Sequence, residues 1–322
     1  MPGERRDRCE VNWLVETPGA DPVRGVVQWD PAHSLWNGGM LAAALVFGPA
    51  TATPAALVVF AFTTGGALLL GHSVGFHRLM IHRSFSTVPA VERFLVWCGT
   101  VAGMSGPMWI VRTHDLRDWA QRQRQCHDYL AHRRPMLVDA WWQLHCRLRL
   151  DHPPAFDLRK IEAVGFYRFL ERTWMAQQLP VAMALWLLGG WGFVVWGVFA
   201  RVAITVHGHW FVGHLAHRRG PQSWLVKTAG VQAHDVPWAA IPTMGEAWHN
   251  NHHAYPGSAR IGLYPGQHDW GFLFIRLLVR LGLAWDVCLP ERMPERDDVL
   301  QAVPASSRRV RARPIPSRGL ES

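Results

Sequence analysis

Residues 34–71 read SLWNGGMLAAALVFGPATATPAALVVFAFTTGGALLLG and contain no charged residue and no histidine. A helix needs about 20 apolar residues to cross the hydrocarbon core of a membrane. This run is long enough for two such helices, and Gly48, Pro49 and Pro54 offer a bend between them. We therefore expect a helical hairpin with spans at about 36–51 and 54–74.

A second uncharged run extends from Thr173 to Ala200, and after Arg201 it resumes as far as Gly213. The pair Gly189-Gly190 divides it, which predicts two further spans at about 174–189 and 191–212. The sequence is thus typical of an all-α membrane protein with four transmembrane helices in two hairpins. The alternative is a large soluble protein with two buried hairpins, which runs of this length disfavour.

The composition supports this class, because 49% of the residues are hydrophobic and only 18% are charged. The formal charge is +9, and basic residues gather beside the predicted spans: Arg78, Arg83, Arg112, Arg117, Arg218 and Arg219. Positive flanks face the cytoplasm, so we expect both termini on the cytoplasmic side. Charge that flanks membrane segments does not indicate a nucleic-acid partner. The excess of arginine over lysine suggests a bacterial source, and hence the inner membrane.

Three regions follow from these patterns. Residues 1–33 form a polar N-terminal segment, residues 34–289 form the membrane domain, and residues 290–322 are predicted to be a disordered basic tail. Within the membrane domain, residues 75–172 and 214–289 are expected to build a cytoplasmic helical cap.

Two smaller features complete the organisation. Residues 94–111 are uncharged but only marginally long, and we expect a helix lying at the membrane interface. The five cysteines form no Cys-x-x-Cys pair. An odd count on the reducing side argues against disulfides, so we predict packing roles for them.

Eighteen histidines include two clusters with informative spacing. Residues 71–85, GHSVGFHRLMIHRSF, place His77 and His82 five apart at the end of the second span. Residues 245–256, GEAWHNNHHAYP, place His249, His252 and His253 at i, i+3 and i+4, where a helix brings His249 onto one face with both others. Imidazoles so close repel when protonated unless a metal ion keeps them neutral.

Two further histidines, His114 and His217, follow the interfacial segment and the fourth span. All these histidines fall on the predicted cytoplasmic side, so they can converge on one site. Seven imidazoles exceed what one four-coordinate structural zinc needs, and we expect two metal ions. Nitrogen ligands without thiolates favour iron, with zinc as the alternative. Iron held by neutral ligands can activate O2 against an unactivated CH2 group.

These motifs resemble the membrane-bound acyl-CoA desaturases of the stearoyl-CoA type. Residues 71–85 are similar to the first histidine box of that family and residues 245–256 to the third, and the resemblance covers about residues 35–290. It implies a four-helix membrane fold with a cytoplasmic cap, two iron ions (Fe2+/Fe3+), O2 as co-substrate, an external electron donor and formation of a cis double bond. The residues that match the ligands of the family are His77, His82, His114, His217, His249, His252 and His253. We assign four neighbours to the substrate or to the support of the ligands: Arg78, Trp248, Asn250 and Arg260.

The second box departs from the family pattern. The family usually has His-Arg-x-His-His, whereas this chain has His114-Asp-Leu-Arg-Asp118, so Arg117 and Asp118 replace two histidines. Asp118 lies at i+4 from His114, and we predict an oxygen ligand there; the alternative is a pair with Arg117 or a nearby arginine. Three histidines are candidates for the missing ligands: His127, His132 and His214. For the first two, surface histidines of a basic loop are the favoured alternative.

We therefore predict a di-iron fatty acyl desaturase that acts on an acyl-CoA or an acyl lipid in the membrane. The alternatives are a hydroxylase on the same scaffold and a non-catalytic membrane protein with a structural metal. The sequence contains neither a Gly-x-Gly-x-x-Gly fingerprint nor a cysteine cluster. Electrons must then come from a separate partner, such as a cytochrome b5-like protein or a ferredoxin.

Overall fold

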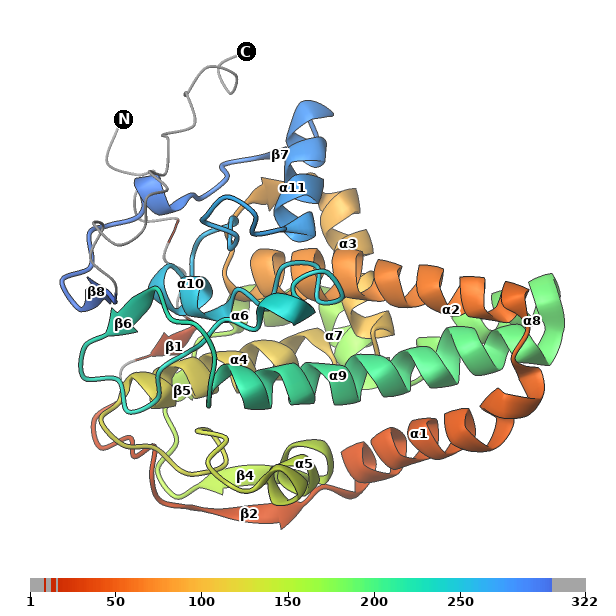
Figure 1. Ribbon diagram of the computed structural model, residues 1–322, viewed down its shortest axis with the longest axis horizontal. Coiled ribbons are helices and arrows are strands. Elements are labelled where there is room, and N and C mark those ends of the chain that lie inside the picture. Colours follow the sequence, from red (N-terminus) through yellow and green to blue (C-terminus); the bar gives the residue numbers. More distant parts are fainter. Residues whose placement is uncertain (1–8, 10–12, 16, 303–322) are drawn as a thin grey trace.

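The computed structural model describes residue 9, residues 13–15 and residues 17–302 of the 322-residue chain. In these ranges the chain is mostly helical, which confirms the main feature of the predicted class. Long helices run across the molecule, and short helices and strands gather toward one end of them (Figure 1). The short strands were not predicted.

The first hairpin consists of α1, Pro31–Thr51, and α2, Pro54–Gly66. Both helices have proline in the first turn, where the missing N–H costs no hydrogen bond. Asp30 caps α1 and Thr53 caps α2, each by accepting a backbone N–H three residues further on. The chain therefore turns at residues 52 and 53, close to the predicted bend.

The second helix of this hairpin does not end where α2 ends. It continues into η2, Ala67–Ile81, which is a π-helix with hydrogen bonds from i to i+5. The last of these joins His82 N–H to His77 O at 3.1 Å. The predicted span at 54–74 is thus part of a longer helix that carries the first histidine cluster at its end.

The second apolar run forms three consecutive helical segments: α8 (Gln178–Val194), η3 (Val195–Ala200) and α9 (Arg201–Ala216). Gly189 and Gly190 have non-helical backbone angles, and the φ of Gly190 is +71°, a left-handed value that glycine adopts without strain. Leu185 before this break packs with Val194 and Val198 after it. The chain therefore folds back at the glycine pair, as predicted.

Two described helices are long and apolar enough to cross a membrane: Pro54–Ile81 with 28 residues and Gln178–Ala216 with 39 residues. Their apolar side chains are poorly covered by the rest of the chain. Phe62 on α2 is 81% exposed, and Leu188 on α8 is 77% exposed. A soluble protein would bury such helices, so the structure disfavours the soluble alternative.

The remaining helices build the smaller elements around the ends of the hairpins: α3 (Pro89–Val101), α4 (Pro107–Arg122), α5 (Met136–His145), α6 (Arg159–Glu162), α7 (Gly165–Thr173), η4 (Pro237–Ala239), α10 (His249–Ala254), α11 (Trp270–Arg280) and η5 (Pro290–Arg292). The described strands pair antiparallel in four two-stranded sheets: β1 (Leu14–Val15) with β5 (Ala155–Phe156), β2 (Gly25–Trp29) with β4 (Cys146–Leu150), β3 (Ser86–Thr87) with β7 (Ala284–Trp285), and β6 (Trp224–Val226) with β8 (Val299–Gln301). Every pair joins segments that are distant in the sequence.

Close packing between α3 and η2 holds the end of the histidine-bearing helix in place. A Cβ atom on Gly71 would lie 2.4 Å from Cys98 O, and one on Gly75 would lie 2.2 Å from Leu95 O. Because only glycine lacks a Cβ, these two positions allow the backbones to approach. The glycines of the first histidine motif therefore serve packing.

The prediction of one interfacial helix over residues 94–111 is wrong. The chain ends α3 at Val101, turns, and begins α4 at Pro107. Gly103 in the turn has φ +87°, which residues other than glycine rarely adopt. The turn lets α4 change direction and carry His114 to the other histidines.

The prediction that all cysteines only pack is also wrong, because Cys9 and Cys288 form a disulfide with their Cα atoms 5.5 Å apart. The N-terminal segment returns over the end of η2, where Trp13 Nε1 donates to Ile81 O at 2.8 Å. This return brings together two cysteines that are 279 residues apart. The remaining three cysteines are free: Cys98, Cys126 and Cys146.

The predicted disorder of the C-terminal tail is wrong for residues 290–302. This segment forms η5 and β8. Arg296 anchors it by a hydrogen bond to Ala254 O at 3.1 Å, and β8 pairs with β6. Residues 303–322 lie outside the described part, as do residues 1–8, 10–12 and 16 of the predicted N-terminal segment.

Candidate metal centre

His77 and His82 lie at the end of η2 with their ring centroids 4.8 Å apart. In an α-helix, residues five apart point about 140° away from each other, because each residue turns the helix by about 100°. The i to i+5 hydrogen bonding of the π-helix returns them to neighbouring positions. His77 and His82 therefore lie side by side because the α-helix becomes a π-helix in this segment.

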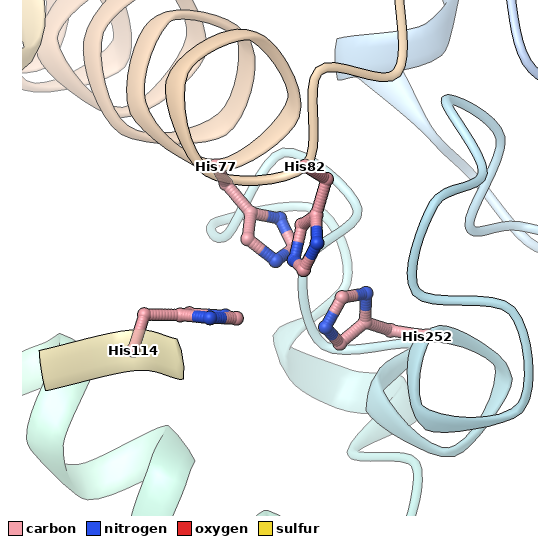
Figure 2. A group of neighbouring side chains, drawn as sticks. All are labelled: His77, His82, His114 and His252. Atoms are coloured by element: carbon pink, nitrogen blue, oxygen red, sulfur yellow. The ribbon is translucent and has the colours of Figure 1, made fainter. Parts of the chain in front are cut away.

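His114 from α4 and His252 from α10 complete a group of four imidazoles with His77 and His82, which we call site A. Each of the four offers a nitrogen, and these nitrogens all lie within 4.8 Å of one another. Figure 2 shows the rings of His77 and His82 at the end of one helix, with those of His114 and His252 facing them from two other segments. The ring of His252 lies 4.5 Å from that of His77 and 4.8 Å from that of His82.

His217, His249 and His253 form a second group, which we call site B. His249 Nε2 lies 3.1 Å from His217 Nε2 and 3.1 Å from His253 Nε2. A single nitrogen such as His249 Nε2 can take part in only one of these two contacts as a hydrogen bond. The other contact then brings two nitrogens together without a hydrogen bond, unless a metal ion lies between them. Imidazoles on a shared ion, with N–metal bonds of about 2.1 Å, place their nitrogens about 3.0–3.4 Å apart.

The short helix α10 divides its three histidines between the two sites. His249 and His253, at i and i+4, face site B, whereas His252 faces site A. The expectation that His249 shares one face with both others therefore needs correction. The centroids of His252 and His253 are 5.7 Å apart, so sites A and B are neighbours.

A group that accepts the N–H of one ring nitrogen leaves the lone pair of the imidazole on the other nitrogen. His217 Nδ1 lies 2.7 Å from Gly213 O, and since a carbonyl only accepts, this nitrogen carries the hydrogen. In His217 the lone pair is then on Nε2, as in histidines that bind a metal. His77 Nδ1 lies 2.5 Å from Glu246 Oε2, so the carboxylate faces the His77 ring.

A buried charge network supports site A from behind. Arg78 is 1% exposed; it lies 3.1 Å from Glu246 Oε1 and donates to Asp269 Oδ1 at 2.7 Å. A Cβ atom on Gly271 would overlap the guanidinium of Arg78, so only glycine leaves space for the Arg78 side chain here. Arg78 thus contacts Glu246, which in turn faces His77.

The ring nitrogens of both sites are suited to bind a metal ion. His82 Nε2 and both ring nitrogens of His252 are buried without a hydrogen-bond partner among the described residues. Burial lowers the pKa of His82 and of His252 well below the ordinary value. At site B burial, opposed in part by Asp118, lowers the pKa of His253 to about 4. Neutral rings with free lone pairs are suitable ligands for a transition metal.

Asp118 lies beside site A, where its ion contacts among the described residues are to histidines. Its Oδ2 is 3.9 Å from His114 Nδ1 and 4.0 Å from His252 Nε2. Burial acts to raise the pKa of Asp118, but His114, His253 and Arg122 hold it below the ordinary value. Arg117 instead donates to Gln143 Oε1 at 2.7 Å, and no described salt bridge joins an arginine to Asp118.

The three candidate substitute ligands lie outside both sites. His132 and His214 form a third group with Asp139. His127 is separate: its Nδ1 accepts from the backbone N–H of Tyr129 at 3.1 Å. The structure therefore brings two of the three candidates together and leaves the third apart.

The other predicted neighbours brace the segments around the sites. Asn250 Oδ1 accepts the backbone N–H groups of Ser223 and Trp224 at 2.7 and 2.9 Å. Trp248 Nε1 donates to a backbone carbonyl, that of His268, at 2.9 Å. Arg260 pairs with Glu291.

One pocket of about 280 Å³ reaches site A from the surface. His82 and Asp118 line it together with two arginines, Arg122 and Arg296. Of the four histidines of site A, only His82 lines this pocket.

No protein-family model matches the chain. Curated relatives do match over most of its length. It is 36% identical over 238 residues to an sn-1 stearoyl-lipid 9-desaturase of Anabaena variabilis, covering 71% of this chain and 81% of that protein. It is 33% identical over 235 residues to an sn-1 stearoyl-lipid 9-desaturase of Synechocystis sp., covering 70% and 69%. It is 32% identical over 277 residues to an acyl-CoA C20 Delta5-desaturase of Anemone leveillei, covering 83% and 84%.

The chain belongs to the fatty acyl desaturase family. Desaturases of this family are metal-dependent oxidoreductases that act on paired donors with O2 as acceptor. The function of the chain is fatty acyl desaturation. The histidine clusters of the structure agree with this function.

Three carboxylates of this desaturase received no role from the sequence. Glu246 lies within the third motif and Asp269 lies thirteen residues after it, but their shared partner Arg78 is distant in the chain. Asp139 is the one charged residue in the segment MLVDAWW, residues 136–142. An isolated charge in an apolar segment indicates a buried polar contact, but its partners, His132 and His214, are seen only in the tertiary structure.

Proposed function

We propose that this desaturase introduces a double bond into a fatty acyl chain with O2 and two iron ions, one at site A and one at site B. One observation carries the proposal: seven imidazoles from four segments converge in two adjacent groups of four and three. A structural zinc is four-coordinate and needs only one such group. This argues against the alternative of a non-catalytic protein.

Iron suits the donor set, because imidazole nitrogens bind it well. When bound, it supplies the reduction of O2 and the removal of hydrogen from two adjacent CH2 groups. The protein holds the imidazoles in orientation through Glu246 and Gly213 O. Burial of the ligand rings keeps bulk water away; His252, for instance, is 1% exposed.

We further propose that the second histidine motif is an altered form of the stearoyl-CoA type, in which Asp118 ligates the metal of site A. The support is its position 3.9 Å from His114 Nδ1 and 4.0 Å from His252 Nε2, in its ionised form. A carboxylate is an ordinary partner of imidazole in iron sites.

The variant Asp118→Ala is therefore expected to bind the iron of site A at least about 10-fold more weakly, as is usual when a group that supports a metal is lost. Iron per chain after dialysis against a chelator measures this. The matched control is Asp128→Ala, because Asp128 pairs with Arg134 at 3.1 Å away from the sites. Equal iron retention by wild type and Asp118→Ala would remove Asp118 from the ligand set.

For the membrane arrangement we propose four spans, formed by α1, by α2 with η2, and by the two parts of the second run on either side of Gly189-Gly190. The apolar helices present exposed side chains to lipid, as Phe62 and Leu188 do. The cap and both termini would face the cytoplasm, because arginines flank the spans on that side. A bacterial inner membrane is the proposed location.

For the substrate we propose an acyl chain carried by a lipid or by CoA, since the relatives include stearoyl-lipid and acyl-CoA desaturases. Electrons would come from a separate acidic donor, such as a cytochrome b5-like protein or a ferredoxin, that docks on the basic cytoplasmic face.

The test is metal and product analysis of the detergent-purified chain. We expect close to two irons per chain and, after turnover with ferredoxin and ferredoxin reductase under O2, an unsaturated fatty acid identified by mass spectrometry. Zinc, or no stoichiometric metal, would overturn the di-iron proposal. A hydroxylated product would instead identify the hydroxylase alternative.

A further inference from the structure

A third buried polar group lies beside site B. Asp139 on α5 is fully buried, at 0% exposure. Its Oδ2 lies 2.9 Å from His132 Nδ1, 2.8 Å from His214 Nδ1 and 2.9 Å from Trp210 Nε1. Three donors thus meet one carboxylate oxygen, and we call this group the Asp139 hub.

The hub determines where the lone pairs of its imidazoles lie. A carboxylate only accepts, so His132 and His214 each carry a hydrogen on Nδ1 and a lone pair on Nε2. The Nε2 of His132 is buried and has no hydrogen-bond partner among the described residues. Leaving such an atom unpaired costs free energy. The position therefore suits a group that accepts a lone pair.

The backbone at His132 is held in an uncommon conformation. Its φ is +51°, in the left-handed region that residues other than glycine rarely adopt and that is frequent at functional sites. Arg218 stabilises the turn by donating to His132 O at 2.9 Å and to Arg134 O at 2.8 Å. The chain thus maintains a strained turn that fixes the direction of the His132 ring.

The ring of His132 stacks on the ring of His217 in site B, with their centroids 5.2 Å apart and their planes 13° apart. The rings within site B lie at similar distances, but their planes cross at 62° to 81°. Site A has four imidazoles, whereas site B has three. His132 is therefore the nearest additional imidazole on the side of His217, although in this structure it groups with Asp139 and not with the three.

We propose that His132 is a fourth imidazole ligand of site B and that Asp139 is its positioning residue. This inference rests on the proposed metal at site B. It requires the His132 ring to turn out of its stack on His217, so that Nε2 points at site B while Nδ1 keeps the hydrogen bond to Asp139. The hub then compensates for ligands that the second histidine motif no longer provides.

The experiment measures iron per chain for the full-length protein in detergent, with imidazole ligation followed by X-ray absorption at the iron edge. In His132→Ala the iron content is expected to fall from two to close to one per chain. Free imidazole is expected to restore the second iron by filling the space of the lost ring. Asp139→Asn is expected to weaken binding of the second iron about 10- to 100-fold. His127→Ala is the matched control and should keep both irons.

Two results would overturn the inference. One is a His132→Ala variant that holds two irons as tightly as wild type. The other is a lost iron that imidazole does not restore, together with a lower unfolding temperature, which would show a structural role alone. A wild-type chain without stoichiometric iron would instead overturn the proposed function itself, so the two failures are distinguishable.

Discussion

The variant His252→Ala is expected to lose the iron of site A and to lower desaturation by more than about 100-fold, beyond the usual effect of removing a supporting group. His252 is 1% exposed, and both of its ring nitrogens are buried without a hydrogen-bond partner in the described chain. Its ring lies 4.5 Å from that of His77. Removing the ring leaves three of the four imidazoles that form site A.

Iron per chain and the amount of unsaturated product measure this effect. His152→Ala is the matched control, because His152 is an exposed histidine between β4 and β5. A His252→Ala variant that keeps two irons and a rate near that of wild type would show that site A does not bind the catalytic metal.

The variant Arg78→Met is expected to lower the free energy of unfolding by about 3–5 kcal/mol, the usual effect of removing one partner of a buried ion pair. Arg78 is 1% exposed and pairs with Glu246 at 3.1 Å and Asp269 at 2.7 Å. Without the guanidinium, two carboxylates remain buried without a compensating charge. Glu246 would also lose the partner that holds it against His77.

Chemical unfolding in detergent, followed by circular dichroism, measures the change. The control is Arg24→Met, since the side chain of Arg24 is 79% exposed and its contact with Asp21 is 3.8 Å long. Exposed pairs contribute about 0–1 kcal/mol. If Arg78→Met also stays within about 1 kcal/mol of wild type, the network does not stabilise the fold as inferred.

Local patterns predicted a large part of the molecule. The uncharged runs predicted helices at all four positions, because the length of an apolar run and the position of Gly and Pro are properties of neighbouring residues. The spacing of His77 with His82, and of His249 with His252 and His253, predicted five of the seven histidines that converge. His114 and His217 were predicted from their positions after apolar segments. Ligand pairs on one helix are short-range features, and the sequence shows them directly.

The sequence by itself determined the apolar helices, the family and the identity of the histidines. Only the tertiary structure decided how the histidines divide into two groups, because His252 and His253 are neighbours in the chain but face different sites. It also decided the partners of Arg78, the Asp139 hub, the disulfide of Cys9 with Cys288, and the ordered part of the tail. Each of these depends on side chains that are distant in the sequence. Their meeting is set by how the helices pack, which no local pattern encodes.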